Sequence, residues 1–115
     1  MPSIRRALLG MMLLSLASLA LAFTTSELEG RAADVLSGYQ ALLTAAEACP
    51  GGACPEAAAI KTGAAAADAE RAQIRADRLT LDPCGNCTEL DRTLGQVDQA
   101  AGELGQVIVA WDEQG

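Results

Sequence analysis

The sequence predicts an all-α protein, a small up-down-up three-helix bundle with heptad-type packing, preceded by an N-terminal signal or anchor helix. Two segments carry apolar residues at alternating spacings of four and three, the pattern of a helix with one buried face. A third segment of similar length is rich in alanine, the residue that favours helix most strongly. Short turns containing proline and glycine separate the three segments, so neighbouring helices are expected to run antiparallel.

Residues 1–22 have the layout of an export signal. Arg5 and Arg6 precede a long apolar run, and Ala20-Leu21-Ala22 supplies the small residues that a signal peptidase reads. The alternative is an uncleaved membrane anchor, because residues 7–23 just reach the length that spans a bilayer. In that case the two arginines would keep the amino end in the cytoplasm. Both interpretations place residues 23–115, one disulfide-stapled helical bundle, across the membrane.

The composition of residues 23–115 excludes several classes of function. Without Arg5 and Arg6, six basic residues face fifteen acidic ones, a net charge of −9, which repels nucleic-acid phosphates and anionic lipids. The chain has no histidine, so histidine-based acid–base catalysis and nucleophilic triads are absent. No glycine-rich phosphate loop occurs. We therefore expect no enzymatic activity, no cofactor and no metal.

The first predicted helix covers residues 26–48. Ser26 and Glu29 fit a capping box, in which the side chain of each residue accepts a hydrogen bond from the backbone amide of the other. Cys49-Pro50-Gly51-Gly52 stops the helix, because proline lacks the amide hydrogen and glycine suits a helix end. Its predicted buried face consists of Leu28, Ala32, Val35, Tyr39, Leu42, Ala46 and Cys49.

The second predicted helix, residues 56–81, has the weakest apolar face. One heptad position holds Ile60, Ala67, Ile74 and Leu81, and the partner position holds Ala57, Ala64, Arg71 and Arg78. We call Arg71, Arg75 and Arg78 the arginine row. The simpler interpretation is that these arginines pair with acidic residues of the other two helices. The alternative makes them candidate partner-binding residues for an anionic protein.

The third predicted helix covers residues 88–111. Its apolar series steps by four and three without interruption and begins at a cysteine; its members are Cys87, Leu90, Leu94, Val97, Ala101, Leu104, Ile108 and Trp111. Asn86 with Glu89, or Thr88 with Asp91, would cap its start. The three internal glycines (Gly95, Gly102 and Gly105) either permit close helix approach or mark a weak helix.

The four cysteines predict two local disulfides, Cys49 with Cys54 and Cys84 with Cys87. Each pair flanks one turn, and a continuous second helix separates the turns by about 39 Å. Disulfide-linked α-carbons lie only about 4–7 Å apart. A break near Gly63 would instead fold the chain back and permit long-range pairing. The same separation argues against a four-cysteine zinc site within one chain.

The stretch Cys84-Gly85-Asn86-Cys87 also raises the possibility of redox chemistry. It is similar to the Cys-Gly-Pro-Cys active-site turn of thioredoxin-like proteins, with asparagine in place of proline. A dithiol at a helix start has a lowered thiol pKa. The similarity covers four residues, and the sequence around it lacks the strand–helix pattern of that fold. A stapled turn is the interpretation we favour.

These observations predict an exported, non-catalytic interaction or accessory protein of the cell envelope, periplasmic or secreted, with an unidentified protein partner. The alanine-rich core is thin for this length, so a partner would add stability. Heptad faces also associate readily between chains. One alternative is an accessory subunit of a membrane complex, anchored by residues 7–23. A second alternative is a thiol–disulfide exchange protein that uses Cys84 and Cys87.

Overall fold

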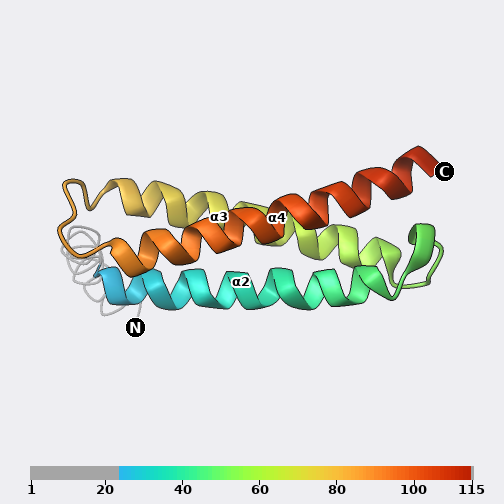
Figure 1. Ribbon diagram of the computed structural model, residues 1–115, viewed down its shortest axis with the longest axis horizontal. Helices are drawn as coiled ribbons and strands as arrows, with labels where there is room; N and C mark the ends of the chain where they lie inside the picture. The colour runs from blue at the N-terminus through green and yellow to red at the C-terminus, as the bar shows by residue number, and fades with distance from the viewer. Residues whose placement is uncertain (1–23, 115) are drawn as a thin grey trace, which may run out of the picture.

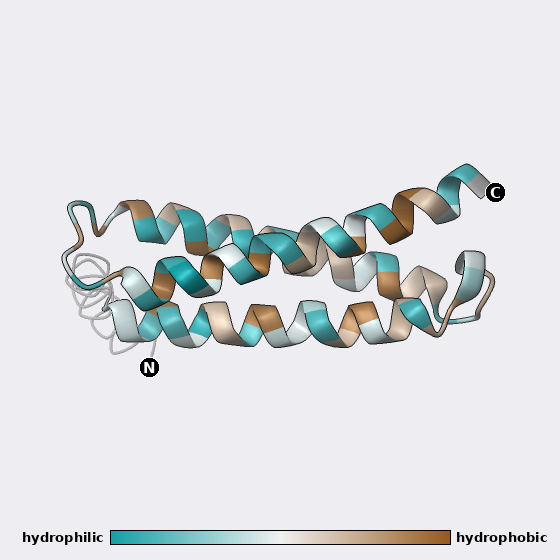
Figure 2. Cartoon of the chain, viewed as in Figure 1, coloured by the Kyte–Doolittle hydropathy of each residue, from teal (hydrophilic) through white to brown (hydrophobic). Residues whose placement is uncertain are grey.

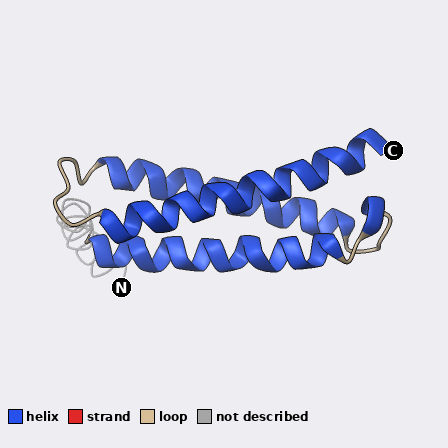
Figure 3. Cartoon of the chain, viewed as in Figure 1, coloured by secondary structure: helices blue, strands red, loops and turns tan. Residues whose placement is uncertain are grey.

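The fold is the predicted three-helix bundle. A computed structural model describes residues 24–114, and every regular element in this range is helical (Figures 1 and 3). The elements are α2 (Thr25–Glu47), the short 3₁₀ turn η1 (Pro50–Gly52), α3 (Ala57–Leu79) and α4 (Thr88–Gln114). The chain runs up, down and up, with a turn at each end of the bundle (Figure 1). The predicted signal or anchor lies outside the described residues.

Helix α2 is the central element of the packing. It lies against both α3 and α4, whereas α3 and α4 contact each other least. Figure 1 shows α4 crossing α3 and ending apart from it at the C-terminal end. This arrangement follows from the side chains, because α2 and α4 carry the long apolar series while α3 buries only Ile60, Ala64 and Ile74. The two helices are joined by ion pairs from Lys61, Arg71, Arg75 and Arg78 to acidic residues of α4.

The core follows the predicted faces of α2 and α4 with few exceptions. Figure 2 shows hydrophobic residues recurring along both helices between hydrophilic ones. Tyr39 and Leu28 of α2, together with Leu90, Leu94 and Leu104 of α4, are almost completely buried. Besides the three buried residues of α3, the other buried residues are Ala32, Val35, Ala46, Cys49, Cys87, Val97, Ala100 and Trp111. Ala100 lies one position beside the predicted series. Leu42, Ala101 and Ile108, which the series includes, are only half-buried.

The helix caps differ from the predicted ones. The hydroxyl of Thr24, not Ser26, accepts the hydrogen bond from the Glu27 amide, at 3.1 Å. Two overlapping Ser/Thr-x-x-Glu patterns are present in the sequence, and the earlier one gives α2 an additional half turn. At α4 the Cys87 carbonyl accepts the Asp91 amide at 2.8 Å, so the backbone of Cys87 occupies the cap position. Both predicted caps for α4 were wrong.

The structure decides against one of the two roles considered for the internal glycines of α4. A side-chain carbon built on Gly95, Gly102 or Gly105 of α4 meets no atom within 4 Å, so none of these three permits close helix approach. Close approach occurs at Gly63 instead, where such a carbon would lie 2.8 Å from the Leu42 side chain of α2. Helix α3 passes through Gly63 without a break. The alternative of a chain folded back at this position is therefore excluded.

Candidate functional site: two stapled turns, an ion-pair network and a groove

The first turn is closed by the predicted Cys49–Cys54 disulfide, with the two α-carbons 5.2 Å apart. Cys49 is fully buried at the end of the α2 face. Gly52 in η1 has a φ of +71°, and a side-chain carbon placed there would lie 2.8 Å from Cγ of Trp111. The indole of α4 thus packs directly on the backbone of this turn. The turn and the C-terminal end of α4 form one packed unit.

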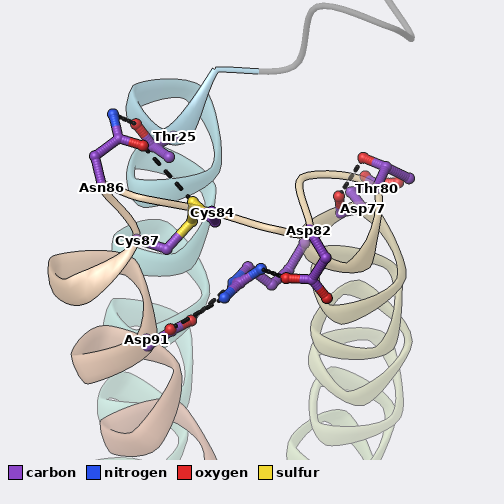
Figure 4. Close-up of a disulfide and its surroundings, with 9 residues drawn as sticks. Thr25, Asp77, Thr80, Asp82, Cys84, Asn86, Cys87 and Asp91 are labelled. Carbon is purple, nitrogen blue, oxygen red and sulfur yellow. Dashed lines mark hydrogen bonds and ion pairs between the residues drawn. A yellow bond between two sulfur atoms is a disulfide. The ribbon is translucent and has the colours of Figure 1, made fainter.

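The second turn is closed by the predicted Cys84–Cys87 disulfide, with α-carbons 5.7 Å apart (Figure 4). Cys87 is buried and Cys84 is half-buried. The side-chain amide of Asn86 donates to the hydroxyl of Thr25 at 3.3 Å, which ties the turn to the start of α2. Asn86 therefore holds the turn in place instead of capping α4.

Both disulfides are local, as predicted, and the chain has no free cysteine within the described residues. Disulfides of this kind indicate an oxidising compartment. The Cys84–Cys87 turn joins two antiparallel helices. In a thioredoxin-like protein the corresponding turn follows a strand, whereas here it follows helix α3. The similarity noted in the sequence is confined to the four residues.

The arginine row lies along α3 facing α4, and each member is paired within the chain. Arg71 donates to Asp98 at 3.1 Å, and Arg75 pairs with the other oxygen of the same carboxylate. Arg78 pairs with Asp91 of α4 at 2.9 Å and with Asp82 of the turn at 2.6 Å (Figure 4). The three arginines therefore pair within the chain, as the simpler interpretation predicts, but their partners lie on α4 and in the second turn and not on α2. A role in binding an anionic partner stays a prediction.

Arg78 is the most covered member of the row, with 18% of its side chain exposed. Its two carboxylate partners raise the pKa of the guanidinium, with the Asp91 hydrogen bond as the largest cause. The same hydrogen bond lowers the pKa of Asp91 below its usual value. This junction joins α3, the second turn and the first turn of α4.

Polar contacts between α2 and α3 were not found from the sequence. Arg31 of α2 bridges Asp77 at 2.6 Å and Glu70 at 3.2 Å. The hydroxyl of Tyr39 donates to Asp68 at 2.5 Å. Glu70 and Asp77 are seven residues apart and hence on one helix face, a spacing that could have indicated a shared basic partner.

Burial of Tyr39 is the main reason that the pKa of its phenol is raised far above its ordinary value. The hydrogen bond to the negatively charged Asp68 acts in the same direction, and the charge on Arg71 opposes it. Tyr39 therefore stays protonated under physiological conditions. It acts as a buried structural donor and offers no base for chemistry.

All six basic residues of the described range take part in intrachain ion pairs. The four arginines already described are joined by Arg92, which pairs with Glu89, and by Lys61, which pairs with Asp112 at 2.8 Å. Eight of the fifteen acidic residues make no ion pair within the described range. The free charge that the bundle presents to other molecules is consequently negative.

A largely apolar groove of about 310 Å³ lies between the first half of α3 and the second half of α4. We call it the α3–α4 groove. Its lining residues are Lys61, Ala64, Ala65, Asp68, Ala101, Leu104, Gly105, Ile108 and Val109. Val109 is 56% exposed, which is high for a large apolar side chain. The sequence predicted the two helices but not the space between them, because a heptad series does not specify how far two helices diverge.

No helix within residues 24–114 combines the length and the apolar character needed to cross a bilayer. No protein-family model, no curated protein and no solved structure matches this chain.

Proposed function

We propose that this chain is an exported, non-catalytic accessory protein that acts by binding another protein outside the cytoplasm, in the periplasm or the extracellular space. The observation that carries the proposal is the α3–α4 groove with its exposed Val109. Apolar surface is costly to leave in water, so a groove of this kind favours a binding role. The two disulfides support the compartment.

The chemistry of the described side chains supports a non-catalytic role. The groove contains one lysine, which is paired with Asp112, and one aspartate, which accepts a hydrogen bond from the Tyr39 hydroxyl. A rigid frame closed at both ends suits recognition, because a preorganised surface loses little entropy on binding.

Site-specific photo-crosslinking in the native cells tests this function. A photoreactive amino acid replaces Val109 in the groove or, as a control, Ala33 on the exposed face of α2. We expect Val109 to give a discrete crosslinked product with one protein, and Ala33 to give none. Fractionation of the same cells should recover the protein outside the cytoplasm. A cytoplasmic location, or the absence of a discrete product from every exposed position tested, would contradict the proposal.

The same fractionation separates the free protein from the anchored alternative. A soluble protein that begins at Phe23 is expected after signal cleavage. A membrane-bound protein that retains residues 7–23 would instead make it an anchored accessory subunit, with the binding role unchanged.

Thiol–disulfide exchange is a second candidate, favoured by the half-buried Cys84 immediately before α4. Replacing Cys87 with serine leaves Cys84 as a free thiol that would trap an exchange partner as a mixed disulfide. We expect Cys87→Ser to trap no specific protein. A discrete mixed disulfide, lost in the Cys84→Ser/Cys87→Ser double variant, would favour exchange over the accessory role.

A further inference from the structure

We infer that the α3–α4 groove receives an amphipathic helix of the partner protein, with an apolar stripe facing the groove and lysine or arginine on its flanks. This inference rests on the proposed function and adds the position and chemistry of the binding site. The bound helix would become the fourth helix of a bundle, a common way for helical proteins to bury an open apolar face.

The length of the groove fits a short helix. An ion pair between Lys61 and Asp112 lies at one end of the groove, and the pairs of Arg71 and Arg75 with Asp98 lie toward the other end. The rise of a helix places these boundaries about 15 Å apart along α3 and about 21 Å apart along α4. Apolar residues at positions i, i+4 and i+7 of a partner helix span about 10 Å and fit within it.

The lining of the groove leaves space that side chains of a partner can fill. Ala64 and Leu104 are buried beneath it, and the groove is flanked by Ala65 and Ala101, whose side chains are short. At Gly105 an added side-chain carbon would meet no atom within 4 Å. Ridges of a third helix pack into a depression of this kind between two helices.

The charge around the groove indicates which charge the partner helix should carry on either side of its apolar stripe. Lys61 is engaged by Asp112, and Asp68 makes no ion pair within the described range. The net charge of −9 for residues 23–115 disfavours a second copy of this chain and an anionic membrane surface. Basic flanking residues would complement both Asp68 and the net negative charge of the bundle.

A second hollow between helices fits an apolar stripe less well than the α3–α4 groove does. A depression of about 280 Å³ between α2 and α4 is lined by Leu36, Leu43 and Ala100, but also by four polar residues, Gln40, Gln96, Gln99 and Glu103. Burying several side-chain amides without partners would cost binding energy. The α3–α4 groove is therefore the better site for an apolar stripe.

A peptide-binding experiment with the exported full protein tests the inference. The probe is a labelled synthetic helical peptide with leucine at positions i, i+4 and i+7 and lysine on both flanks. A second peptide replaces each lysine with glutamate. By fluorescence anisotropy we expect the lysine peptide to bind at least about tenfold more tightly at low salt, with the difference decreasing as salt screens the charges.

Gly105→Leu fills the groove, and Gly38→Leu is its matched control. Both positions are helical glycines with open space around them, so both variants should fold and gain helix propensity. Gly38 lies on α2, outside the groove. We expect Gly105→Leu to weaken binding of the lysine peptide at least about tenfold and Gly38→Leu to leave it within about twofold. Circular dichroism confirms that both variants remain helical.

Three results would overturn the inference: no binding of the lysine peptide, equal binding of the two peptides, or equal effects of Gly105→Leu and Gly38→Leu. Crosslinking in cells separates this failure from failure of the proposed function. Leu36 lies in the hollow between α2 and α4. A discrete product from a photoreactive residue at Leu36 but not at Val109 would contradict the α3–α4 groove as the binding site and leave the accessory role standing. No product from these or from any other exposed position would contradict both.

Discussion

At the scale of single residues, the buried phenol of Tyr39 is the clearest case in which packing sets a chemical property. Its side chain lies among apolar residues of α2 and α4, yet its hydroxyl reaches Asp68 of α3 at 2.5 Å. The contact satisfies a polar atom that would otherwise be costly to bury. It also joins α2 to α3 near the floor of the α3–α4 groove.

Tyr39 should titrate well above its ordinary pKa of 10.0. The folded state holds the proton more tightly than the unfolded state, so this stabilisation is complete below pH 10 and is lost as the pH rises above it. Tyr39 is the only tyrosine, so phenolate absorbance reports it directly. We expect Asp68→Asn to lower the midpoint partway, since burial remains. A titration midpoint near 10 in the folded protein would contradict this prediction. So would a Tyr39→Phe variant that loses as much stability at alkaline pH as the unchanged protein does.

Arg78 should contribute more to stability than an ordinary surface arginine. It joins Asp82 and Asp91, whereas Arg92 pairs only with Glu89 in its own helix. We expect Arg78→Gln to lower the free energy of unfolding by about 1 kcal/mol at neutral pH and Arg92→Gln to change it by less than about 0.5 kcal/mol. Urea titrations of both variants measure the difference. Equal effects of the two substitutions would show that the ion pairs of Arg78 with Asp82 and Asp91 add nothing to the free energy of unfolding.

The same junction predicts an acid response with a definite sign. Because Arg78 lowers the pKa of Asp91, the folded state favours the ionised carboxylate. The resulting stabilisation is present above the ordinary value of 3.8 and is lost as the pH falls below it. In Arg78→Gln the dependence of stability on pH in this acidic range should become shallower. An unchanged slope would mean that Asp91 titrates alike in the folded and unfolded states.

At the scale of the elements, Gly52 and Gly63 are both close to another helix, but they should respond differently to the same substitution. Alanine at Gly52 would meet the rigid indole of Trp111 and force a positive φ on a residue that disfavours it. Alanine at Gly63 would meet only the end of the flexible Leu42 side chain, and it gains helix propensity. The two variants form a matched pair.

We expect Gly52→Ala to lower the free energy of unfolding by about 1–3 kcal/mol, and Gly63→Ala to change it by less than about 1 kcal/mol. Trp111 is the only tryptophan, so its fluorescence reports the first turn. Gly52→Ala should shift the emission to the red as the indole becomes exposed. An unchanged emission together with unchanged stability would show that the turn adapts without cost.

The sequence predicted the elements well because their signals are local. Apolar spacing identified the buried faces of α2 and α4, and proline and glycine identified the turns. The caps were wrong where two signals overlapped, as with Thr24 and Ser26, or where another contact engaged the residue, as with Asn86 and Thr25. Asp91 was assigned to a cap because its partner, Arg78, lies on another helix. Such choices depend on tertiary neighbours.

At the scale of the whole molecule, the topology followed from three segments of similar length joined by short turns. The disulfide pairing followed from the distance that a continuous helix places between its ends. The α3–α4 groove did not follow, since the divergence of two helices depends on all the side chains between them. In α3 those side chains are mostly alanines and paired arginines, which tie α3 to α4 by polar contacts without filling the space. A thin core and an open groove thus have the same origin in composition.

The architecture of the native protein can be checked by one non-reduced tryptic map, with free thiols alkylated beforehand. Cleavage after Arg31, Lys61, Arg78 and Arg92 places the two disulfides in separate peptides, residues 32–61 and 79–92. We expect each peptide to carry its own internal bridge, and the first peptide to begin at Phe23. A reduced and alkylated digest is the control. Peptides linked to each other would contradict the topology, because the ends of α3 are too far apart to share a disulfide. Alkylated Cys84 and Cys87 would instead show an open dithiol in the cell and favour thiol–disulfide exchange.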